Sequence, residues 1–260
     1  MTRAQLRADE GGIGAGGGYS VFVTRHLDDV RAAQRLRYRV FAGEMAARLH
    51  SAVPGHDADH FDDYCDHLLV RADDTGETVA TYRMLPPDRA AAAGGLYAER
   101  EFDLTALSGL RETLVETGRS CVHPGHRTGA VIGLVWAGLA RYMLRRGHRH
   151  LIGCASVPLA DGGVTAAGVW DVVSARHRGP EEHRVTPLRP WSAAGVERPE
   201  RPAVPPLLRG YLRLGATVVG PPAHDREFGV ADFPVLLDMR RIDRRYRRFF
   251  LGQEDEEPVR

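Results

Sequence analysis

A mixed α/β domain is the fold class that this sequence predicts, on the basis of two patterns. Residues 67–71 and 78–85 have the composition of strands and are separated by turn-forming residues, which predicts a β-hairpin. Residues 111–122, 129–146 and 149–155 predict a strand, a strongly apolar helix and a further strand. That order implies a right-handed parallel crossover in the middle of the fold.

Further elements are expected on both sides of these two patterns. A helix is predicted from Asp28 to about Leu49, because apolar residues recur at helical spacing and Asp28 and Asp29 suit its N-terminal cap. Strands are also expected over residues 19–25, 216–219 and 233–239, and helices over 165–177, 205–214 and 241–250. The Pro- and Arg-rich stretch 178–206 has no clear element.

One globular domain is expected over residues 19–251, with 156–202 as a variable insertion. The chain has 260 residues, of which 43% are apolar and 27% charged, so it has ample material for a core. Residues 1–18 contain the run GGIGAGGG, which predicts a flexible tail because ordering glycine costs much backbone entropy. Residues 252–260 are an acidic tail.

Composition argues against several classes of function. The net charge is only +1, which gives no global basis for nucleic-acid binding. Three cysteines without CxxC spacing favour neither a disulfide framework nor a zinc site, and no metal is expected. No apolar run approaches the roughly 20 residues that cross a bilayer, and the N-terminus lacks a signal pattern. We expect a cytoplasmic protein that could meet the inner membrane face only at its surface.

The most informative stretch is 115–143, where a predicted strand runs into a helix through a Pro/Gly/basic turn. Such a turn directs backbone N–H groups and the positive end of a helix dipole at one point, which suits a phosphate. An ordinary strand–turn–helix with incidental glycines is the alternative. The candidate phosphate-binding residues are Cys121, Val122, Arg127, Thr128 and Gly129.

Several long motifs carry a resemblance to a known family. They include LRYRVFAGE (36–44), DADHFDDYCDHLLV (57–70), ETGRSCV (116–122) and VPPLLRGYLRLGA (204–216). With these motifs the chain resembles the ornithine-acyl-carrier-protein N-acyltransferases, distant kin of the acyl-homoserine-lactone synthases, over about residues 27–155 and 203–250. The resemblance implies a GNAT-type mixed, mostly antiparallel sheet flanked by helices. It also implies transfer of a (3-hydroxy)acyl chain to the amine of a small amino acid, ornithine, giving a lyso-aminolipid.

The acyl donor that the resemblance implies is the acyl-phosphopantetheine of acyl carrier protein, with no permanently bound cofactor. GNAT enzymes hold the pyrophosphate of coenzyme A with the pattern Arg/Gln-x-x-Gly-x-Gly/Ala. Here Arg127 matches, but the small positions are Ala130 and Ile132. The isoleucine crowds a pyrophosphate, whereas a single phosphodiester needs fewer amides, so the turn favours the carrier protein. A coenzyme A-dependent N-acetyltransferase is one alternative, and an inactive carrier- or membrane-binding module is another.

The candidate catalytic residues are Glu116, Arg119 and Ser120 on the strand that leads to the turn. Acyl transfer to an amine needs a base and then donors for an oxyanion, so we expect Glu116 as the base and a strand amide near Cys121 or Val122 as a donor. Alternation would place Glu116 and Ser120 on one face and Arg119 on the other. The resemblance implies that this neighbourhood is functional; a simple Glu116–Arg119 ion pair is the alternative.

Two groups of residues are candidates for binding the amine. A predicted helix face carries a cation, an aromatic ring and a carboxylate, and the following loop holds five aspartates within ten residues, a density that calls for a nearby cation such as an ammonium group. A half-buried helix with one ion pair and a solvated acidic turn are the alternatives. The candidate substrate-binding residues are Arg37, Phe41, Glu44, Asp59, Asp62 and Arg83. Finally, RRIDRRYRRFF (240–250) predicts a basic amphipathic helix suited to an acidic carrier protein or an anionic membrane surface.

Overall fold

The computed structural model describes residues 12–242, which divide into two compact units. Unit 1 holds the described residues up to Pro86 together with Thr117–His148, and unit 2 holds Pro87–Glu116 and Arg149–Ile242. The chain leaves unit 1, returns to it within a strand, and leaves it again, so neither unit is a continuous segment. The single domain expected over residues 19–251 stays a prediction. Most of the predicted basic helix 240–250 and the acidic tail 252–260 lie outside the described residues.

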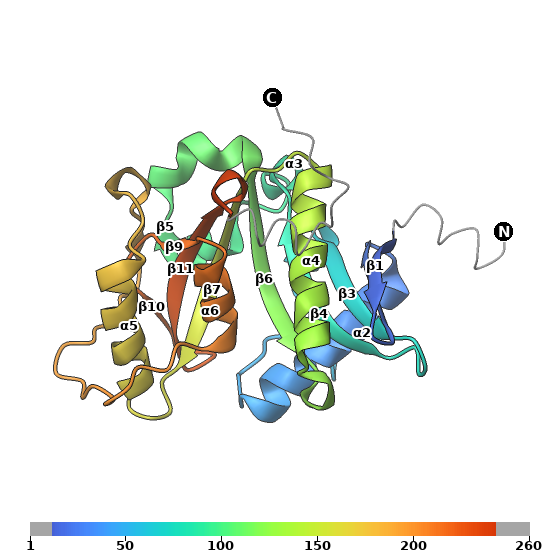
Figure 1. Cartoon of the computed structure of the whole chain (residues 1–260), viewed down its shortest axis with the longest axis horizontal. Coiled ribbons are helices and arrows are strands. Elements are labelled where there is room, and N and C mark those ends of the chain that lie inside the picture. Colours follow the sequence, from blue (N-terminus) through green and yellow to red (C-terminus); the bar gives the residue numbers. More distant parts are fainter. Residues whose placement is uncertain (1–11, 243–260) are drawn as a thin grey trace. The chain divides into compact units, whose positions relative to one another are not determined.

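Four antiparallel strands follow one another across the sheet of unit 1 (Figure 1). They are β1 (Gly12–Gly16), β2 (Tyr19–Thr24), β3 (Asp66–Ala72) and β4 (Thr78–Leu85). In register, Val21 lies opposite Val70 and Leu68 opposite Tyr82. The predicted hairpin is thereby confirmed. Nearly every residue of β3 and β4 is buried, as expected of strands covered on both faces.

The strand β1 lies where we predicted a flexible tail. Gly17 and Gly18 form the two-residue connection to β2 with φ of 61° and 82°, the combination that a type I′ hairpin turn requires. Pairing with β2 supplies the backbone hydrogen bonds that offset the entropy cost of ordering the glycines.

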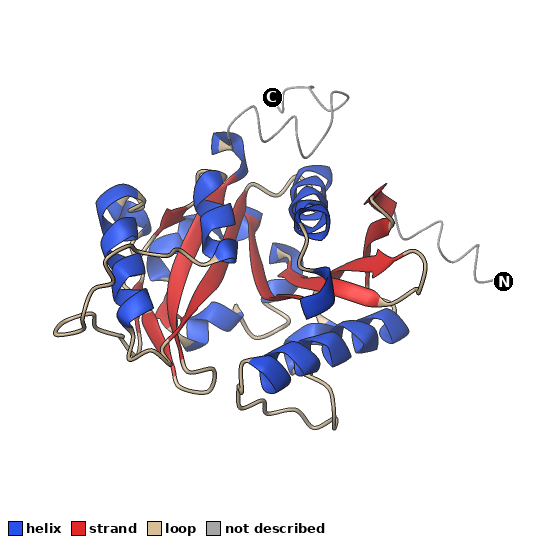
Figure 2. Cartoon of the chain, turned by 60° about the horizontal axis from the view of Figure 1, so that its bottom comes forward, coloured by secondary structure: helices blue, strands red, loops and turns tan. Residues whose placement is uncertain are grey.

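Helices cover both faces of this sheet (Figure 2). α2 (Leu27–Tyr38) covers one face and α4 (Gly129–Arg145) the other. Gly138 lets α4 approach closely, because a Cβ there would lie 2.7 Å from Leu68 Cδ1 and 3.0 Å from Val21 Cγ2. The helix predicted to about Leu49 is too long: α2 passes into a π-helical turn, η1 (Arg39–Glu44), and the helical path ends there.

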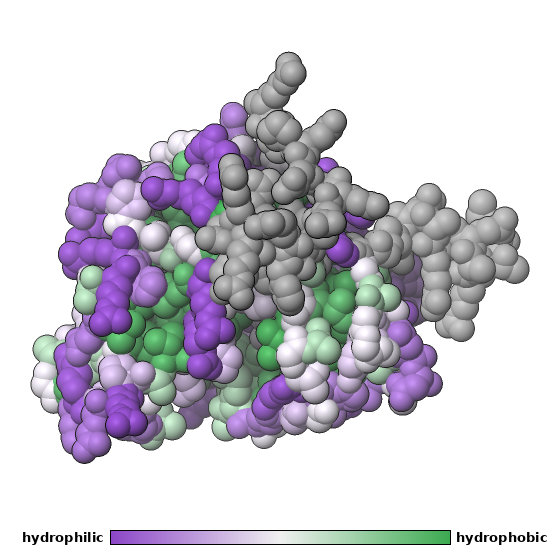
Figure 3. Space-filling view, viewed as in Figure 1, coloured by the Kyte–Doolittle hydropathy of each residue, from purple (hydrophilic) through white to green (hydrophobic). Residues whose placement is uncertain are grey.

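Unit 2 is built on a long antiparallel pair, β7 (His150–Pro158) and β11 (Val230–Asp238). The shorter strands β9 (Thr217–Val218) and β10 (Ala223–Asp225) both pair with β11. The helices α5 (Val164–Arg176) and α6 (Pro206–Arg213) agree with the predicted ones. In Figure 3, apolar surface shows between α5 and α6 of this unit and, separately, over α4 of unit 1.

Short elements complete the described chain. They are α3 (Pro87–Ala90), η2 (His60–Asp63), η3 (Tyr97–Arg100), η4 (Thr105–Thr113), η5 (Pro124–His126), η6 (Glu181–His183), η7 (Met239–Arg241), and the pair β5 (Phe102–Asp103) and β8 (Thr186–Pro187). Of the helix predicted over 241–250, the described part is only the end of η7 and the extended Ile242.

The predicted fold class, a mixed and mostly antiparallel α/β fold with flanking helices, is confirmed. The chain order of β6 (Leu114–Val122), α4 and β7 is the predicted strand, helix and strand. None of the helices within residues 12–242 combines the length and apolarity that spanning a membrane requires.

Candidate active site

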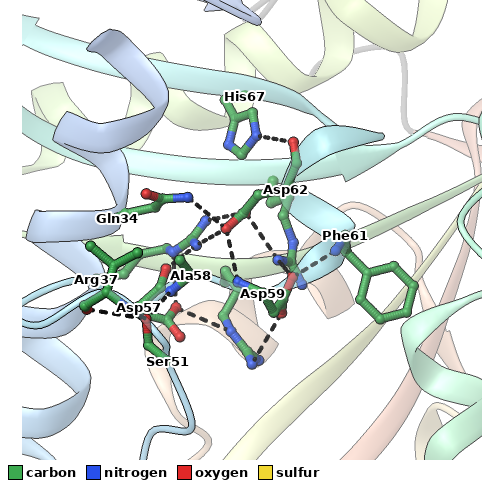
Figure 4. A network of polar contacts seen from close by, with 12 residues as sticks. Gln34, Arg37, Ser51, Asp57, Ala58, Asp59, Phe61, Asp62 and His67 are labelled. Atoms are coloured by element: carbon green, nitrogen blue, oxygen red, sulfur yellow. Dashed lines mark hydrogen bonds and ion pairs between the residues drawn. The ribbon is translucent and has the colours of Figure 1, made fainter. Parts of the chain in front are cut away.

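A buried network of guanidinium and carboxylate groups lies in unit 1 (Figure 4). At its centre is Arg37 on α2, whose side chain is fully buried. Its Nη1 and Nη2 atoms donate to the two carboxylate oxygens of Asp62 at 2.9 and 2.7 Å, a bidentate pair. The Arg37 Nε lies 2.9 Å from Asp57 Oδ2, and its Nη2 also donates to the backbone oxygen of Asp57. Arg37 therefore holds the acidic loop at two points, Asp57 and Asp62.

Two further arginines join the network from β4 and β6. Arg83 Nη1 donates to Asp59 Oδ1 at 2.6 Å and to Asp62 Oδ1 at 3.1 Å. Arg119 Nε lies 3.2 Å from Asp57 Oδ2, and Arg119 Nη2 lies 3.7 Å from Asp59 Oδ2. Three guanidinium groups thus face three carboxylates, Asp57, Asp59 and Asp62.

The acidic loop is folded by its own carboxylates. Asp59 and Asp62 form a capping box around η2, in which Asp59 Oδ1 accepts from Phe61 N and Asp62 Oδ2 accepts from Asp59 N. Gln34 Nε2 also donates to Asp62 Oδ2, at 2.9 Å. Burial alone would raise the pKa of Asp62, but Arg37 and Arg83 hold that pKa well below its usual value.

The cation that the acidic loop requires is therefore present within the chain itself. We looked to the ammonium groups of a substrate for it, because the arginines come from distant parts of the sequence. The structure gathers Arg37, Asp59, Asp62 and Arg83, four of the six candidate amine-binding residues, into this network. Phe41 is a buried residue of η1, and the role of all six in binding an amine stays a prediction.

Arg119 interrupts the regular alternation that we predicted for β6. Its φ of 52° lies in the left-handed region, which costs a residue other than glycine roughly 1–2 kcal/mol. Its ion pairs with Asp57 and Asp59 offset that cost. The simple alternation of faces across Glu116, Arg119 and Ser120 is therefore wrong at Arg119, where the backbone turns.

Glu116 is held at the other end of β6, within unit 2. Only 7% of the residue is exposed. Its two carboxylate oxygens accept hydrogen bonds from the backbone N–H groups of Tyr97 and Ala98 at 2.6 and 2.7 Å. The first turn of η3 thus fixes the orientation of this carboxylate. Sequence analysis identified Glu116 but not the amides that position it, because they lie 18 and 19 residues away.

The predicted phosphate turn leads into α4, and the first turn of this helix is exposed to solvent. Thr128 caps α4 by accepting from Val131 N, and Gly129, Ala130 and Ile132 are exposed. The helix itself does not use the N–H groups of its first residues. Arg127 donates to Glu44 Oε2 at 2.7 Å and to the backbone oxygen of Val122 at 3.2 Å. The structure therefore brings Glu44, a candidate amine-binding residue, to the turn.

Two cysteines lie near these groups, and burial raises the pKa of both thiols. The pKa of Cys121 on β6 is raised to about 12. The pKa of Cys154 on β7 is raised well above its usual value by burial and then by the carboxylates of Glu101, Asp232, Glu116 and Asp225. Such thiols stay protonated and make poor nucleophiles, which agrees with a structural role for both.

Three of these carboxylates form a second acidic group, in unit 2. One oxygen each of Glu101, Asp225 and Asp232 lies within 4.8 Å of the others, close enough to share a cation. Sequence analysis missed this group because its members are far apart in the chain and form no local motif. They come together only through the pairing of β10 with β11 and the position of the residue after η3.

His67 on β3 gives a testable pH dependence. It is fully buried beside the network, and Nε2 lies 3.1 Å from the backbone oxygen of Asp62. Burial lowers the pKa of His67 to about 4 from 6.5, so on acidification the unfolded chain binds this proton first. Acidification therefore destabilises the folded protein between about pH 6.5 and pH 4. We expect the free energy of unfolding to fall by about 2 kcal/mol from pH 7 to pH 5.

Urea unfolding of the wild type and of His67→Gln at both pH values measures this contribution. The difference in the free energy of unfolding between pH 7 and pH 5 should be smaller in His67→Gln than in the wild type. It should be unchanged in His26→Gln, which replaces an exposed histidine. Equal pH dependence in the wild type and His67→Gln would show that His67 is not responsible. The pKa of His150 is also lowered by burial, so the comparison with the wild type is essential.

A GNAT-type acyltransferase is the class that the sequence similarities define. The family model described as acetyltransferase (GNAT) domain matches residues 36–137. Among solved structures, the coenzyme A-dependent acyl-homoserine lactone synthase BjaI, bound to S-adenosylmethionine and isopentyl-CoA, is similar with a TM-score of 0.52 at 16% identity, over 86% of this chain and 81% of that one. The acyl-homoserine-lactone synthase LasI is similar with a TM-score of 0.51 at 14% identity, over 91% and 96%. At these identities the likeness concerns the fold alone.

Sequence relatives specify the family. The L-ornithine N(alpha)-acyltransferase of Rhodobacter capsulatus is 35% identical over 89% of this chain and 94% of its own length. Enzymes of the same name from Agrobacterium fabrum and Brucella abortus are 33% and 34% identical, over 95% and 92% of this chain and 90% of each relative. The chain belongs to the L-ornithine N(alpha)-acyltransferase family, and the resemblance seen in the sequence is confirmed.

Proposed function

We propose that this enzyme transfers an acyl chain from acyl carrier protein to the α-amine of ornithine, giving N-acylornithine. The acceptor rests on the family: three relatives that carry the name L-ornithine N(alpha)-acyltransferase match this chain over nearly its full length. The donor rests on the turn at Arg127–Gly129. A 3-hydroxyacyl chain as the transferred group remains a prediction from the sequence resemblance.

Glu116 acts in this proposal as the base that takes a proton from the ammonium of the acceptor. The neutral amine attacks the thioester carbonyl, a C–N bond forms, and the C–S bond breaks as the tetrahedral intermediate collapses. The pantetheine sulfur leaves and is protonated to a thiol. Support for Glu116 comes from its fixed orientation, since two backbone amides hold its oxygens. A β6 amide near Cys121 or Val122 would stabilise the oxyanion.

Arg119 and Ser120 have a positioning role in this proposal. Arg119 takes a left-handed backbone conformation three residues after Glu116 and ties β6 to the acidic loop through Asp57 and Asp59. Because those ion pairs constrain the strand, they support the orientation of its neighbours. Ser120, the next residue, is half-buried on the same strand.

A carrier-bound donor is favoured by the composition of the phosphate turn. Coenzyme A would place a pyrophosphate at the first turn of α4, where Ile132 replaces the second small residue of the GNAT pattern and Arg127 is already paired with Glu44. The phosphodiester of protein-bound phosphopantetheine carries one negative charge and needs fewer donors. The amides at the start of α4 and the Thr128 cap suit such a group.

The test is a transfer assay with purified protein. Incubation with 3-hydroxyacyl carrier protein and ornithine should yield N-acylornithine, detected by mass spectrometry, with acylation at the α-amine shown by fragmentation. The same acyl group on coenzyme A should react at least tenfold more slowly. Equal or faster reaction from coenzyme A would overturn the donor. Absence of product from ornithine, lysine and glutamine with either donor would overturn the proposed function.

A further inference from the structure

Exposed apolar and basic side chains occur in the segments that the Glu44–Arg127 ion pair joins at the phosphate turn of unit 1. Five large apolar side chains are more than a third exposed in the described part of the chain. Three of them lie within seven residues of Glu44 or Arg127, the pair that joins η1 to the turn: Tyr38 is 41% exposed, Met45 39% and Ile132 37%. Apolar side chains exposed together in this way are typical of a contact surface for another molecule.

The charges beside these side chains are mostly positive. Over residues 27–48, Arg37, Arg39, Asp29 and Glu44 are each neutralised by an ion pair. Arg31, Arg35 and Arg48 are exposed and form no ion pair with the described residues. Asp28 is the one exposed carboxylate of this segment that likewise forms no ion pair with them. The surface therefore presents an excess of guanidinium groups although the whole chain has a net charge of only +1.

The outward face of α2 mixes both kinds of residue. Leu27, Arg31, Arg35 and Tyr38 follow one another at helical spacing and are all exposed, while the opposite face packs on β4. Figure 2 shows this helix on the outside of the unit 1 strands. The helix continues into η1, and Glu44 of η1 forms an ion pair with Arg127 of the phosphate turn, with 2.7 Å between Oε2 and Nη2. Only the C-terminal end of this face, through η1, is thus joined to the point where the donor phosphate would bind.

We propose that the acyl carrier protein docks on this surface, formed by Tyr38, Met45, Ile132, Arg35 and Arg48, and this inference rests on the proposed carrier-bound donor. The phosphodiester of phosphopantetheine is bonded directly to a side chain of the carrier. A phosphate held at the start of α4 therefore places the surface of the carrier a few ångströms away, over η1 and the first turn of α4. An acidic carrier is complementary to the unpaired arginines, and the three apolar side chains supply the contact area.

The experiment compares two donors in one set of variants. In Arg35→Glu/Arg48→Glu, the KM for acyl carrier protein should rise about tenfold or more with little change in kcat. With acyl-pantetheine, which has no carrier, both constants should equal those of the wild type. Met45→Ser should raise the KM for acyl carrier protein but leave the KM for acyl-pantetheine unchanged. Arg213→Glu changes the charge of an exposed arginine on α6 and should have no effect with either donor.

Two independent measurements complete the test. The affinity for holo acyl carrier protein, measured by calorimetry, should fall in Arg35→Glu/Arg48→Glu, and the wild-type affinity should weaken as salt rises. An unchanged KM and affinity in that variant would overturn the docking surface while leaving the proposed function intact. If the wild type reacts only with coenzyme A donors, both proposals fail. If the variant loses binding to phosphatidylglycerol vesicles but keeps its KM for acyl carrier protein, the surface is a membrane contact and the inference is wrong.

Discussion

Replacement of Glu116 by glutamine should lower kcat/KM for N-acylornithine formation by about 10²- to 10⁴-fold, the usual contribution of a general base. The substitution keeps the size of the side chain but removes its ability to accept the proton of the ammonium group. Initial rates with acyl carrier protein and ornithine as substrates measure the change.

A structural contribution of Glu116 has to be separated from a chemical one. The carboxylate also holds the N–H groups of Tyr97 and Ala98, and glutamine turns an amide N–H₂ toward one of them. The thermal midpoint of each variant therefore accompanies the kinetics. Glu112→Gln, at an exposed position of η4, is the matched control and should react like the wild type. A folded Glu116→Gln with full activity would rule out the role as base.

The substitution Arg37→Met should lower the free energy of unfolding by about 3–5 kcal/mol, as expected when one partner of a buried ion pair is removed. Methionine removes the bidentate partner of Asp62 and one of the two guanidinium groups beside Asp57, where only Arg119 remains. Asp62 has a depressed pKa in the folded protein, so in the variant its desolvation is compensated only in part, by Arg83 and Gln34. Urea unfolding followed by circular dichroism measures the change.

The matched control lies two residues further along the helical path. Arg39 pairs with Glu77 at 3.1 Å, but the two side chains are 55% and 42% exposed, so Arg39→Met should cost less than about 1 kcal/mol. Adding Asp62→Leu to Arg37→Met should restore part of the lost stability, because it removes one of the two carboxylates that lost a partner. Similar losses for Arg37→Met and Arg39→Met would contradict the importance of the buried network.

Local patterns in the sequence predicted the elements that depend on local chemistry. The hairpin of β3 and β4 is set by two stretches of strand-forming composition and a short turn, and α4 by a long apolar stretch between Thr128 and Gly147. Both follow from the neighbours of each residue along the chain. The turn at Gly17–Gly18 carried an equally local signal, two glycines suited to a type I′ hairpin, which we read as flexibility because the preceding strand is itself rich in glycine.

The active-site residues were identified individually, but their partners were not. Arg37 and Asp62 are 25 residues apart and Arg119 and Asp57 are 62 apart, so no spacing rule pairs them. The same holds for Glu101, Asp225 and Asp232 in unit 2. Their proximity is a property of strand register and helix packing. The two compact units have no local signal in the sequence either, because one boundary between them falls inside β6, between Glu116 and Thr117.

The protonated thiols have a practical consequence for studying this chain. Alkylating reagents such as iodoacetamide attack the thiolate, so Cys121 in unit 1 and Cys154 in unit 2 should react very slowly in the folded protein at neutral pH. Labelling then requires an opening of the surrounding structure that restores an ordinary thiol. Because each unit contains one of these residues, peptide-resolved alkylation rates report the opening of the two units separately in a single sample, without any added probe.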